Sequence, residues 1–258
     1  METSTNRITA PALAKMAVSN FETETRVCSE HGQYIALLTP AGWSGCSTCG
    51  AAALRADVRA AEQANADASR MRRAGIPERF FRARLGNFNP PTPAAELALK
   101  VAQHYAGDFP SVRAAGQCLI LCGNVGTGKT HLAIGVMHQV MALGCTARYA
   151  VMIDVARAVK ETYRKDSVVT ESAVLERFIA PDLLVLDEIG MQVGSDTEKM
   201  ITFSIINSRY SQMRPTIVIS NLAMPLLKDF LTERVMDRMR DGGGLAVAFD
   251  WDSYRRAA

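Results

Sequence analysis

The sequence contains no apolar run that approaches the length of a membrane-spanning helix, which argues against an integral membrane protein. Residues 1–17 are polar and lack the apolar core of a secretion signal, so we expect a cytoplasmic protein. No internal repeat is visible. The net charge of +3 shows no strong excess of one sign. It permits contact with nucleic acid through local basic clusters but does not require it.

What the sequence does contain indicates a substantial folded core. A hydrophobic content of 48% over 258 residues allows one large domain, or one domain and a small module. The six cysteines are expected to be thiols or metal ligands rather than disulfides, because a cytoplasmic protein is kept reduced. Cys118, Cys122 and Cys145 lie in or beside apolar strands and are interpreted as small buried residues.

Residues 123–130 read GNVGTGKT and match the phosphate-binding loop pattern G-x-x-x-x-G-K-[ST] at every fixed position. A short apolar run precedes the loop, and a helix is expected from Lys129. The glycines let the backbone turn its N–H groups toward phosphate oxygens, and the helix adds its positive N-terminal end. The expected nucleotide-binding residues are Gly123, Asn124, Val125, Gly126, Thr127, Gly128, Lys129, Thr130 and His131.

A second element completes this site. The apolar run Leu183–Leu186 ends in Asp187 and Glu188. We expect Lys129 to meet the β- and γ-phosphates, while Thr130 and Asp187 hold Mg²⁺. Glu188 is placed to polarise an attacking water, which favours hydrolysis. The alternative is a chance glycine loop beside an ordinary acidic turn, and the matching strand and helix context argues against it.

Four residues near the N-terminus have the spacing of a metal site. Cys28, His31, Cys46 and Cys49 form C-x₂-H-x₁₄-C-x₂-C, which predicts a structural, tetrahedral Zn²⁺ site. A catalytic zinc is not expected, because four protein ligands leave no open position. The alternative is three loose thiols and a surface histidine.

The order of elements predicts an α/β fold with a five-stranded parallel sheet flanked by helices, preceded by a small zinc-binding module. Helices are expected to begin near Lys129, Asp154, Glu171, Thr197 and Pro225. The expected strands are Cys118–Cys122, Ala147–Met152, Leu183–Asp187, Thr216–Ser220 and Leu245–Phe249. The expected division of the chain is a flexible arm (1–26), the zinc module (27–50), a helical linker (51–75) and the nucleotide-binding domain (76–258).

From about Gly75 to the C-terminus the sequence resembles the AAA+ ATPases, specifically the bacterial replicative helicase loader (DnaC) and IstB-like family. Besides the phosphate loop, five stretches carry the resemblance: 74–77 (AGIP), 187–190 (DEIG), 214–216 (RPT), 233–239 (ERVMDRM) and 249–255 (FDWDSYR). The last of these is more similar to DnaC than to IstB. The resemblance implies a P-loop AAA+ fold that uses ATP.

The resemblance also implies roles for single residues. Asn221 resembles the sensor of the γ-phosphate, and Arg238 resembles the finger donated to a neighbour's ATP, with Arg234 as second candidate. An arginine on a helix surface is the alternative for both. Arg255 resembles a second sensor, although the sequence shows no helical lid around it. The segment Tyr163–Lys165 lies where such loaders contact single-stranded DNA; a helix end with a half-buried tyrosine is the alternative.

These features indicate an ATP-dependent loader that places the hexameric replicative helicase on single-stranded DNA. We expect residues 1–75 to bind the helicase, and the AAA+ domains to self-associate with ATP at their interfaces; Mg²⁺ and Zn²⁺ are the expected metals. One alternative is an IstB-like helper of a DNA transposase. Another is a non-enzymatic zinc adaptor whose ATP site only switches binding, against which Glu188 argues.

Overall fold

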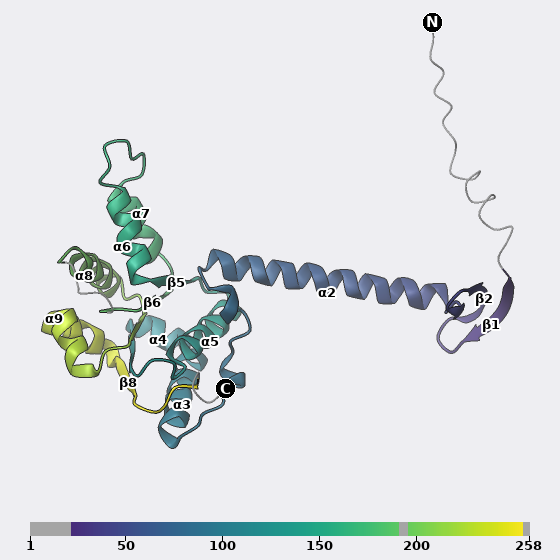
Figure 1. Cartoon of the computed structure of the whole chain (residues 1–258), viewed down its shortest axis with the longest axis horizontal. Coiled ribbons are helices and arrows are strands. Elements are labelled where there is room, and N and C mark those ends of the chain that lie inside the picture. Colours follow the sequence, from purple (N-terminus) through teal and green to yellow (C-terminus); the bar gives the residue numbers. More distant parts are fainter. Residues whose placement is uncertain (1–21, 191–195, 255–258) are drawn as a thin grey trace, which may run out of the picture. The chain divides into compact units, whose positions relative to one another are not determined.

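The computed structural model describes residues 22–190 and 196–254. The chain divides into two compact units, with the division between Asp67 and Ala68 (Figure 1). Within the described ranges, no helix is both long and apolar enough to cross a membrane.

The first unit is a small antiparallel sheet followed by a long helix. Its strands are β1 (Thr23–Cys28), β2 (Gly32–Thr39) and β3 (Gly42–Trp43), in the order β1-β2-β3. Helix α2 (Ser47–Arg73) begins before the expected linker and has no buried residue. Strand β1 likewise begins inside the range expected to be an arm, of which residues 1–21 lie outside the described part. Among the described residues of this unit, only Ala36 and Cys46 are buried.

The second unit contains a five-stranded sheet in the order β5-β6-β7-β4-β8. Every neighbouring pair is parallel, which confirms the predicted sheet. The observed strand bounds differ from the expected ones by at most one residue at either end. These strands are β4 (Leu119–Gly123), β5 (Ala147–Val151), β6 (Leu183–Asp187), β7 (Thr216–Ser220) and β8 (Leu245–Phe249).

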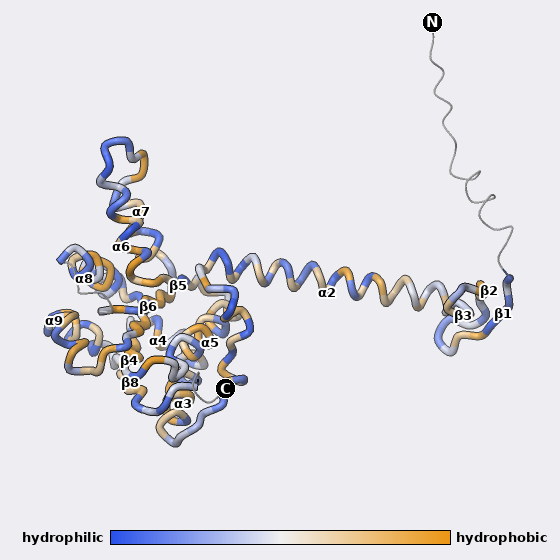
Figure 2. The backbone as a smooth tube through the Cα atoms, in the orientation of Figure 1, coloured by the Kyte–Doolittle hydropathy of each residue, from blue (hydrophilic) through white to orange (hydrophobic). Residues whose placement is uncertain are grey.

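Helices cover both faces of this sheet. Alternate residues of each strand point to opposite faces, so Leu119 and Leu121 belong to one apolar core and Ile120 to the other. Helices α3 (Pro93–Gly107), α4 (Phe109–Ala115) and α5 (Lys129–Ala142) pack on the first face. The second face is covered by α6 (Met152–Glu161), α7 (Glu171–Ile179), α8 (Asp196–Ser211) and α9 (Met224–Arg240). The apolar positions gather where strands and helices meet (orange in Figure 2). Short 3₁₀ turns are η1 (Glu78–Phe80), η2 (Leu85–Asn87) and η3 (Asp241–Gly243).

The amino ends of β6 and β7 are joined by a buried arginine. Arg209 of α8 is 0% exposed, and its Nε donates to Thr216 Oγ1 at 2.9 Å. Burial lowers the pKa of its guanidinium to about 10. Carbonyl oxygens take the place of a carboxylate partner. They belong to Phe178, Ile179, Pro181, Asp182 and Pro215.

Replacing Arg209 by methionine should lower the free energy of unfolding of the second unit by about 3 kcal/mol or more, because several buried carbonyls lose their donor. The measurement is denaturant unfolding followed by circular dichroism. Arg157→Met is the matched control, since Arg157 is exposed and only pairs with Asp154 at 2.9 Å; its expected cost is within about 0.5 kcal/mol. Equal stability of the two variants would contradict this role of Arg209.

Candidate nucleotide site and metal centre

The phosphate loop follows β4 and leads directly into α5. Gly123, Gly126 and Gly128 all have positive φ angles, of 119°, 77° and 95°. A Cβ added at Gly128 would lie 2.5 Å from the Phe88 ring, and one at Gly123 would lie 2.5 Å from the carbonyl oxygen of Phe249. Glycine is therefore required at these two positions by backbone conformation and by space.

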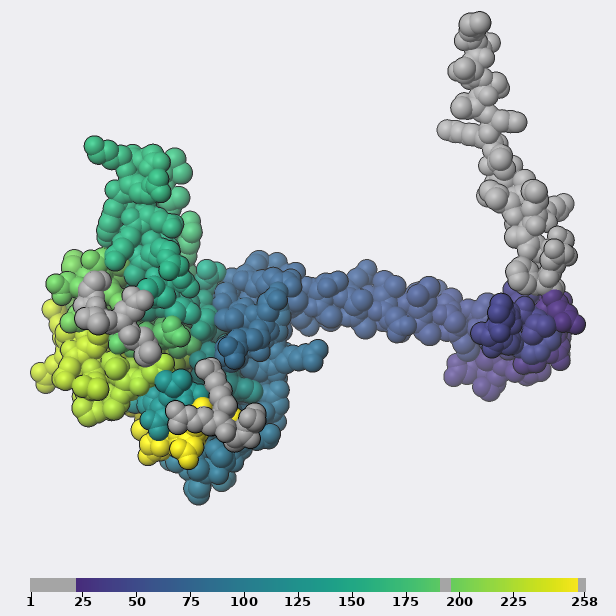
Figure 3. All heavy atoms as spheres, in the orientation of Figure 1, coloured from purple at the N-terminus to yellow at the C-terminus, as the bar shows by residue number. Residues whose placement is uncertain are grey.

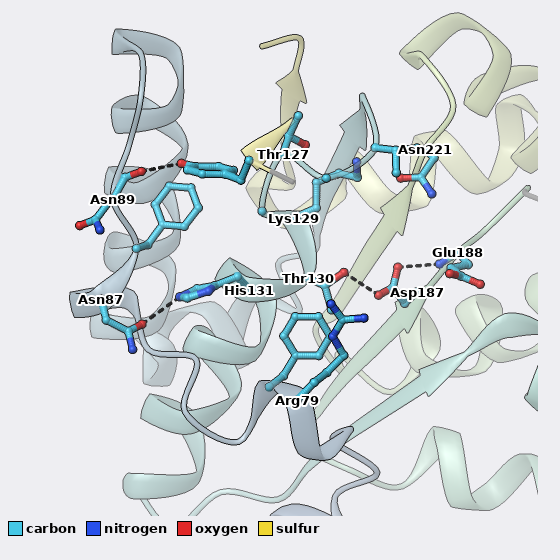
Figure 4. Close-up of a pocket in the computed structure, with 16 residues that line it drawn as sticks. Arg79, Asn87, Asn89, Thr127, Lys129, Thr130, His131, Asp187, Glu188 and Asn221 are labelled. Carbon is cyan, nitrogen blue, oxygen red and sulfur yellow. Dashed lines mark hydrogen bonds between the residues drawn. The ribbon is translucent and has the colours of Figure 1, made fainter. Parts of the chain in front are cut away.

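Lys129 begins α5 and is only 5% exposed. Its Nζ donates hydrogen bonds to the carbonyl oxygens of Gly123 at 2.9 Å and Asn124 at 2.5 Å. These bonds hold the ammonium group inside the curve of the loop (Figure 4). A cation in this position can neutralise phosphate oxygens that the loop N–H groups bind.

Asp187, the last residue of β6, is fixed by three donors. Its Oδ2 accepts from Thr130 Oγ1 at 2.9 Å and from the Tyr149 hydroxyl at 2.8 Å, and its Oδ1 accepts from the Glu188 N–H at 2.7 Å. Burial and the neighbouring Asp187 charge raise the pKa of Tyr149, which keeps its hydroxyl available as a donor. The pairing of Thr130 with Asp187 suits Mg²⁺, which prefers oxygen ligands.

Glu188 and Asn221 lie at the same edge of the sheet. Glu188 is exposed and has the left-handed φ of 60°, which is uncommon outside glycine. The next residue is anchored, because Ile189 N–H donates to Ile219 O at 3.0 Å and Ile189 O accepts from Ser220 Oγ at 2.7 Å. Asn221 follows β7 and lines the same cavity as Glu188. A carboxylate and an amide therefore face the end of the phosphate loop.

The cavity has a volume of about 400 Å³, within the size range of small-molecule sites. The phosphate loop, Asp187, Glu188 and Asn221 form one end. The other end contains aromatic and amide side chains that can surround a flat heterocycle. Those side chains are Phe80, Asn87, Phe88, Asn89, His131 and Tyr254, and Arg79 also lines the cavity.

The His131 ring is oriented by two contacts at its Nε2 atom. Its Nε2 lies 2.9 Å from both Arg84 O and Asn87 Oδ1. Asn87 Oδ1 also accepts from the Arg84 N–H, and its Nδ2 donates to Arg82 O, which fixes the amide orientation. Since both neighbours of Nε2 are acceptors, Nε2 carries the proton.

Residues after β8 close over the loop. Trp251 Nε1 donates to Thr127 O at 3.2 Å, and Tyr254 N–H donates to Gly126 O at 3.0 Å. The Tyr254 hydroxyl donates to Asn89 O at 2.6 Å, and its ring meets the Phe88 ring edge-on at 5.7 Å. No sequence pattern had given Phe88 or Tyr254 a place in this site. The family-like ending at 249–255 was the one signal for Tyr254.

The metal centre of the first unit gathers the four expected residues. Their ligand atoms all lie within 4.8 Å of one another, with Cys49 Sγ 3.3 Å from His31 Nδ1 and 3.6 Å from Cys28 Sγ. Ligands at the corners of a tetrahedral zinc site lie about 3.8 Å apart. Cys28 and Cys49 come from the end of β1 and the start of α2. The set of three thiols and one imidazole fits structural zinc.

The thiols of this centre differ in pKa. The hydrogen bond to Cys28, then burial and the Cys28 charge, raises the pKa of Cys49 to about 11. Backbone N–H groups of Glu30 and His31 lower the pKa of Cys28, and those of Cys49 and Thr48 lower that of Cys46. Backbone N–H groups thus favour the thiolate form of Cys28 and Cys46, whereas Cys28 opposes ionisation of Cys49. A divalent cation among the three sulfur atoms would favour the thiolate form of each.

The remaining expected residues lie away from the cavity. The Arg238 guanidinium lies 5.5 Å from the ring centres of both Phe203 and Tyr210, and neither Arg238 nor Arg234 lines the cavity. The segment Tyr163–Lys165 follows α6 and is exposed, in the turn region between α6 and α7. The part of the chain around these residues forms the green lobe that projects from the second unit in Figure 3. Arg255 lies outside the described residues.

A parallel sheet with a phosphate loop after β4 and an Asp-Glu pair after β6 defines the chain as a P-loop nucleotide-binding protein of the AAA+ type. The family model described as IstB-like ATP binding protein matches residues 100–257. With more than half of its length matched, the chain belongs to this family of ATP-binding proteins. The resemblance to DnaC and IstB-like AAA+ ATPases is confirmed.

Similar proteins and solved structures agree with this family assignment. Replicative helicase loader DnaC of Buchnera aphidicola (subsp. Schizaphis graminum) is 36% identical over 184 residues, covering 71% of this chain and 74% of that protein. DnaC of Escherichia coli K12 is 40% identical over 158 residues, covering 61% and 63%. A crystal structure of the DnaC helicase loader has the same fold, with a TM-score of 0.60 at 21% identity over 67% of this chain and 100% of that chain. AMPPCP-bound DnaA from Aquifex aeolicus reaches 0.55 at 25% identity, over 68% and 52%.

The metal centre predicts one Zn²⁺ per chain. Elemental analysis of protein purified without chelator should find it, and Cys46→Ser should lose it, whereas Cys145→Ser, outside the centre, should keep it. Chelation should unfold the strands of the first unit, which have almost no apolar core, and leave the second unit folded. Absence of stoichiometric zinc from the parent protein would contradict the assignment.

Proposed function

We propose that the protein is an ATP-dependent loader of a replicative DNA helicase. The observation that carries this proposal is the joint presence of a complete nucleotide site and 36–40% identity to proteins named as helicase loaders. The relatives compared above carry the loader name, so a transposase helper is not the function proposed.

The chemistry proposed at the cavity is hydrolysis of ATP. Lys129 and the loop N–H groups bind the β- and γ-phosphates, and Thr130 and Asp187 hold Mg²⁺, which neutralises charge on the phosphates. Glu188 orients the attacking water, and Asn221 contacts the γ-phosphate. The exposure of Glu188 and its place beside Asp187 support this role. An acidic residue there supports hydrolysis over a site that only switches binding.

The helicase is proposed to bind residues 1–75. This region precedes residues 100–257, which carry the family match. The described part of it presents an uncharged sheet face on which Val27 and Ile35 are 75% and 70% exposed. Apolar side chains exposed on a small module support a protein partner. The zinc centre would hold this face in shape.

Single-stranded DNA is proposed to contact the end of α6. Tyr163 is 59% exposed and is followed by Arg164 and Lys165. Arg157 and Lys160 of α6 line one hollow together with Arg164, which follows the helix. An aromatic ring for stacking beside several cations suits a single strand, whose bases and phosphates are both accessible.

Loading should depend on the nucleotide site. With the replicative helicase of its host and circular single-stranded DNA, the protein should transfer helicase to the DNA when ATP is present. Lys129→Ala should lose tight ATP binding, and Glu188→Gln should bind ATP yet lose at least about 100-fold in phosphate release, because the amide cannot polarise water. Glu176→Gln, an exposed glutamate of α7, is the control. Capture of a transposase and not a helicase would contradict the proposal.

Arg238 is proposed to act on the ATP of a neighbouring copy. Arg238→Ala should then bind ATP as the parent does and hydrolyse it poorly. Mixing it with Lys129→Ala should restore some phosphate release, because one interface then joins an intact pocket to an intact arginine. If the mixture stays inactive while both variants are folded and associate, the role in trans is wrong and Arg234 is the next residue to test.

A further inference from the structure

Tyr149 touches the nucleotide site without lining its cavity. The residue is 6% exposed, and its hydroxyl donates to Asp187 Oδ2, the same oxygen that accepts from Thr130. The other two donors to this carboxylate are Thr130 on α5 and Glu188 directly after β6. Tyr149 reaches Asp187 from the neighbouring strand β5.

The backbone of the same residue holds the end of the linker helix. Strand β5 is at the edge of the sheet, paired only with β6 among the described strands. On its free side, Tyr149 N–H donates to Ala74 O at 2.7 Å, and Arg148 Nη1 donates to Arg73 O at 2.8 Å. Gly75, with a φ of 78°, lies so close to the Tyr149 carbonyl oxygen that a Cβ there would collide with it.

We propose that Tyr149 is a positioning residue that orients Asp187 toward Mg²⁺ and ties that orientation to the end of α2. The proposal rests on the proposed function, because Asp187 is assigned to the metal of bound ATP. Mg²⁺ requires near-ideal octahedral geometry, so a carboxylate that can rotate holds it less well. A displacement of residues 73–75 would move β5 at Tyr149, and with it the hydroxyl that fixes Asp187. The end of the linker helix, which leads from the proposed helicase-binding region, would thereby change how well Asp187 holds Mg²⁺.

The first test replaces only the hydroxyl. Tyr149→Phe should raise the Mg²⁺ concentration needed for half-maximal binding of a fluorescent ATP analogue about fivefold, the effect of one hydrogen bond. Its affinity for the analogue in EDTA should stay unchanged. Tyr105→Phe is the matched control: Tyr105 is also buried, but its hydroxyl donates to Gln117 O at 2.8 Å, away from the cavity.

The second test moves the backbone. Gly75→Ala should shift the Mg²⁺ dependence in the same direction as Tyr149→Phe. Gly144→Ala is its control, because Gly144 has a similar φ of 82° with no atom within 4 Å of an added Cβ. Both substitutions introduce strain at a positive φ, but only Gly75→Ala also brings a Cβ against the Tyr149 carbonyl. A difference between the two variants therefore reports the contact with Tyr149. Thermal melting of all four variants identifies a temperature at which each is folded.

The outcomes are distinguishable. If the parent binds no nucleotide at any Mg²⁺ concentration, the proposed function fails. If the parent binds and Tyr149→Phe shows the Mg²⁺ dependence of Tyr105→Phe, the positioning role is overturned. If Tyr149→Phe shifts the dependence while Gly75→Ala matches Gly144→Ala, the link to α2 is overturned.

Discussion

The nucleotide site depends on a loop confined on two sides. The backbone after β4 turns between the Phe88 ring and the Phe249 carbonyl, and each neighbour leaves room only for hydrogen where the loop approaches it most closely. The same contacts connect distant parts of the chain, because Phe88 precedes the sheet and Phe249 ends it. Trp251 and Tyr254 then bond to loop carbonyls. Packing against residues from both ends of the domain therefore sets the conformation of the phosphate loop without a bound nucleotide.

The two ends of the sheet differ in what their polar groups do. At the amino ends, Arg209 satisfies a group of buried carbonyls and leaves no donor for a ligand. At the carboxyl ends, Glu188 is exposed in a left-handed conformation, next to an Asp187 that is buried and accepts three hydrogen bonds. Strain of about 1–3 kcal/mol at such a residue persists only where its surroundings enforce it. Asp187 Oδ1 and the anchored Ile189 provide that enforcement. Stability and function are separated along one set of strands.

The sequence predicted those parts of the structure that depend on local spacing. The phosphate loop, the strand ending in Asp187 and the four metal ligands each follow from a pattern within a few residues. Contacts between distant residues left no such signal. In the sequence Tyr149 has the pattern of an ordinary strand residue. Its hydroxyl reaches Asp187 because β5 lies beside β6. Phe88 lines the cavity because the segment before the sheet packs against the phosphate loop, a contact between residues far apart in the sequence. The early start of α2 was missed because Cys49 was assigned to the zinc module (27–50), whereas it lies in the first turn of the helix.

The two units draw their stability from different sources. The second buries apolar side chains on both faces of a sheet, so its folding does not require an ion. The first buries little besides Ala36 and Cys46, far less than a unit of this size needs. Its Cys/His cluster joins the end of β1 to the start of α2, and an ion bound there would supply most of the stabilisation that a core would provide. Because α2 has no buried residue, nothing along that helix replaces the ion. Loss of zinc would therefore remove the proposed helicase-binding face while leaving the nucleotide site intact.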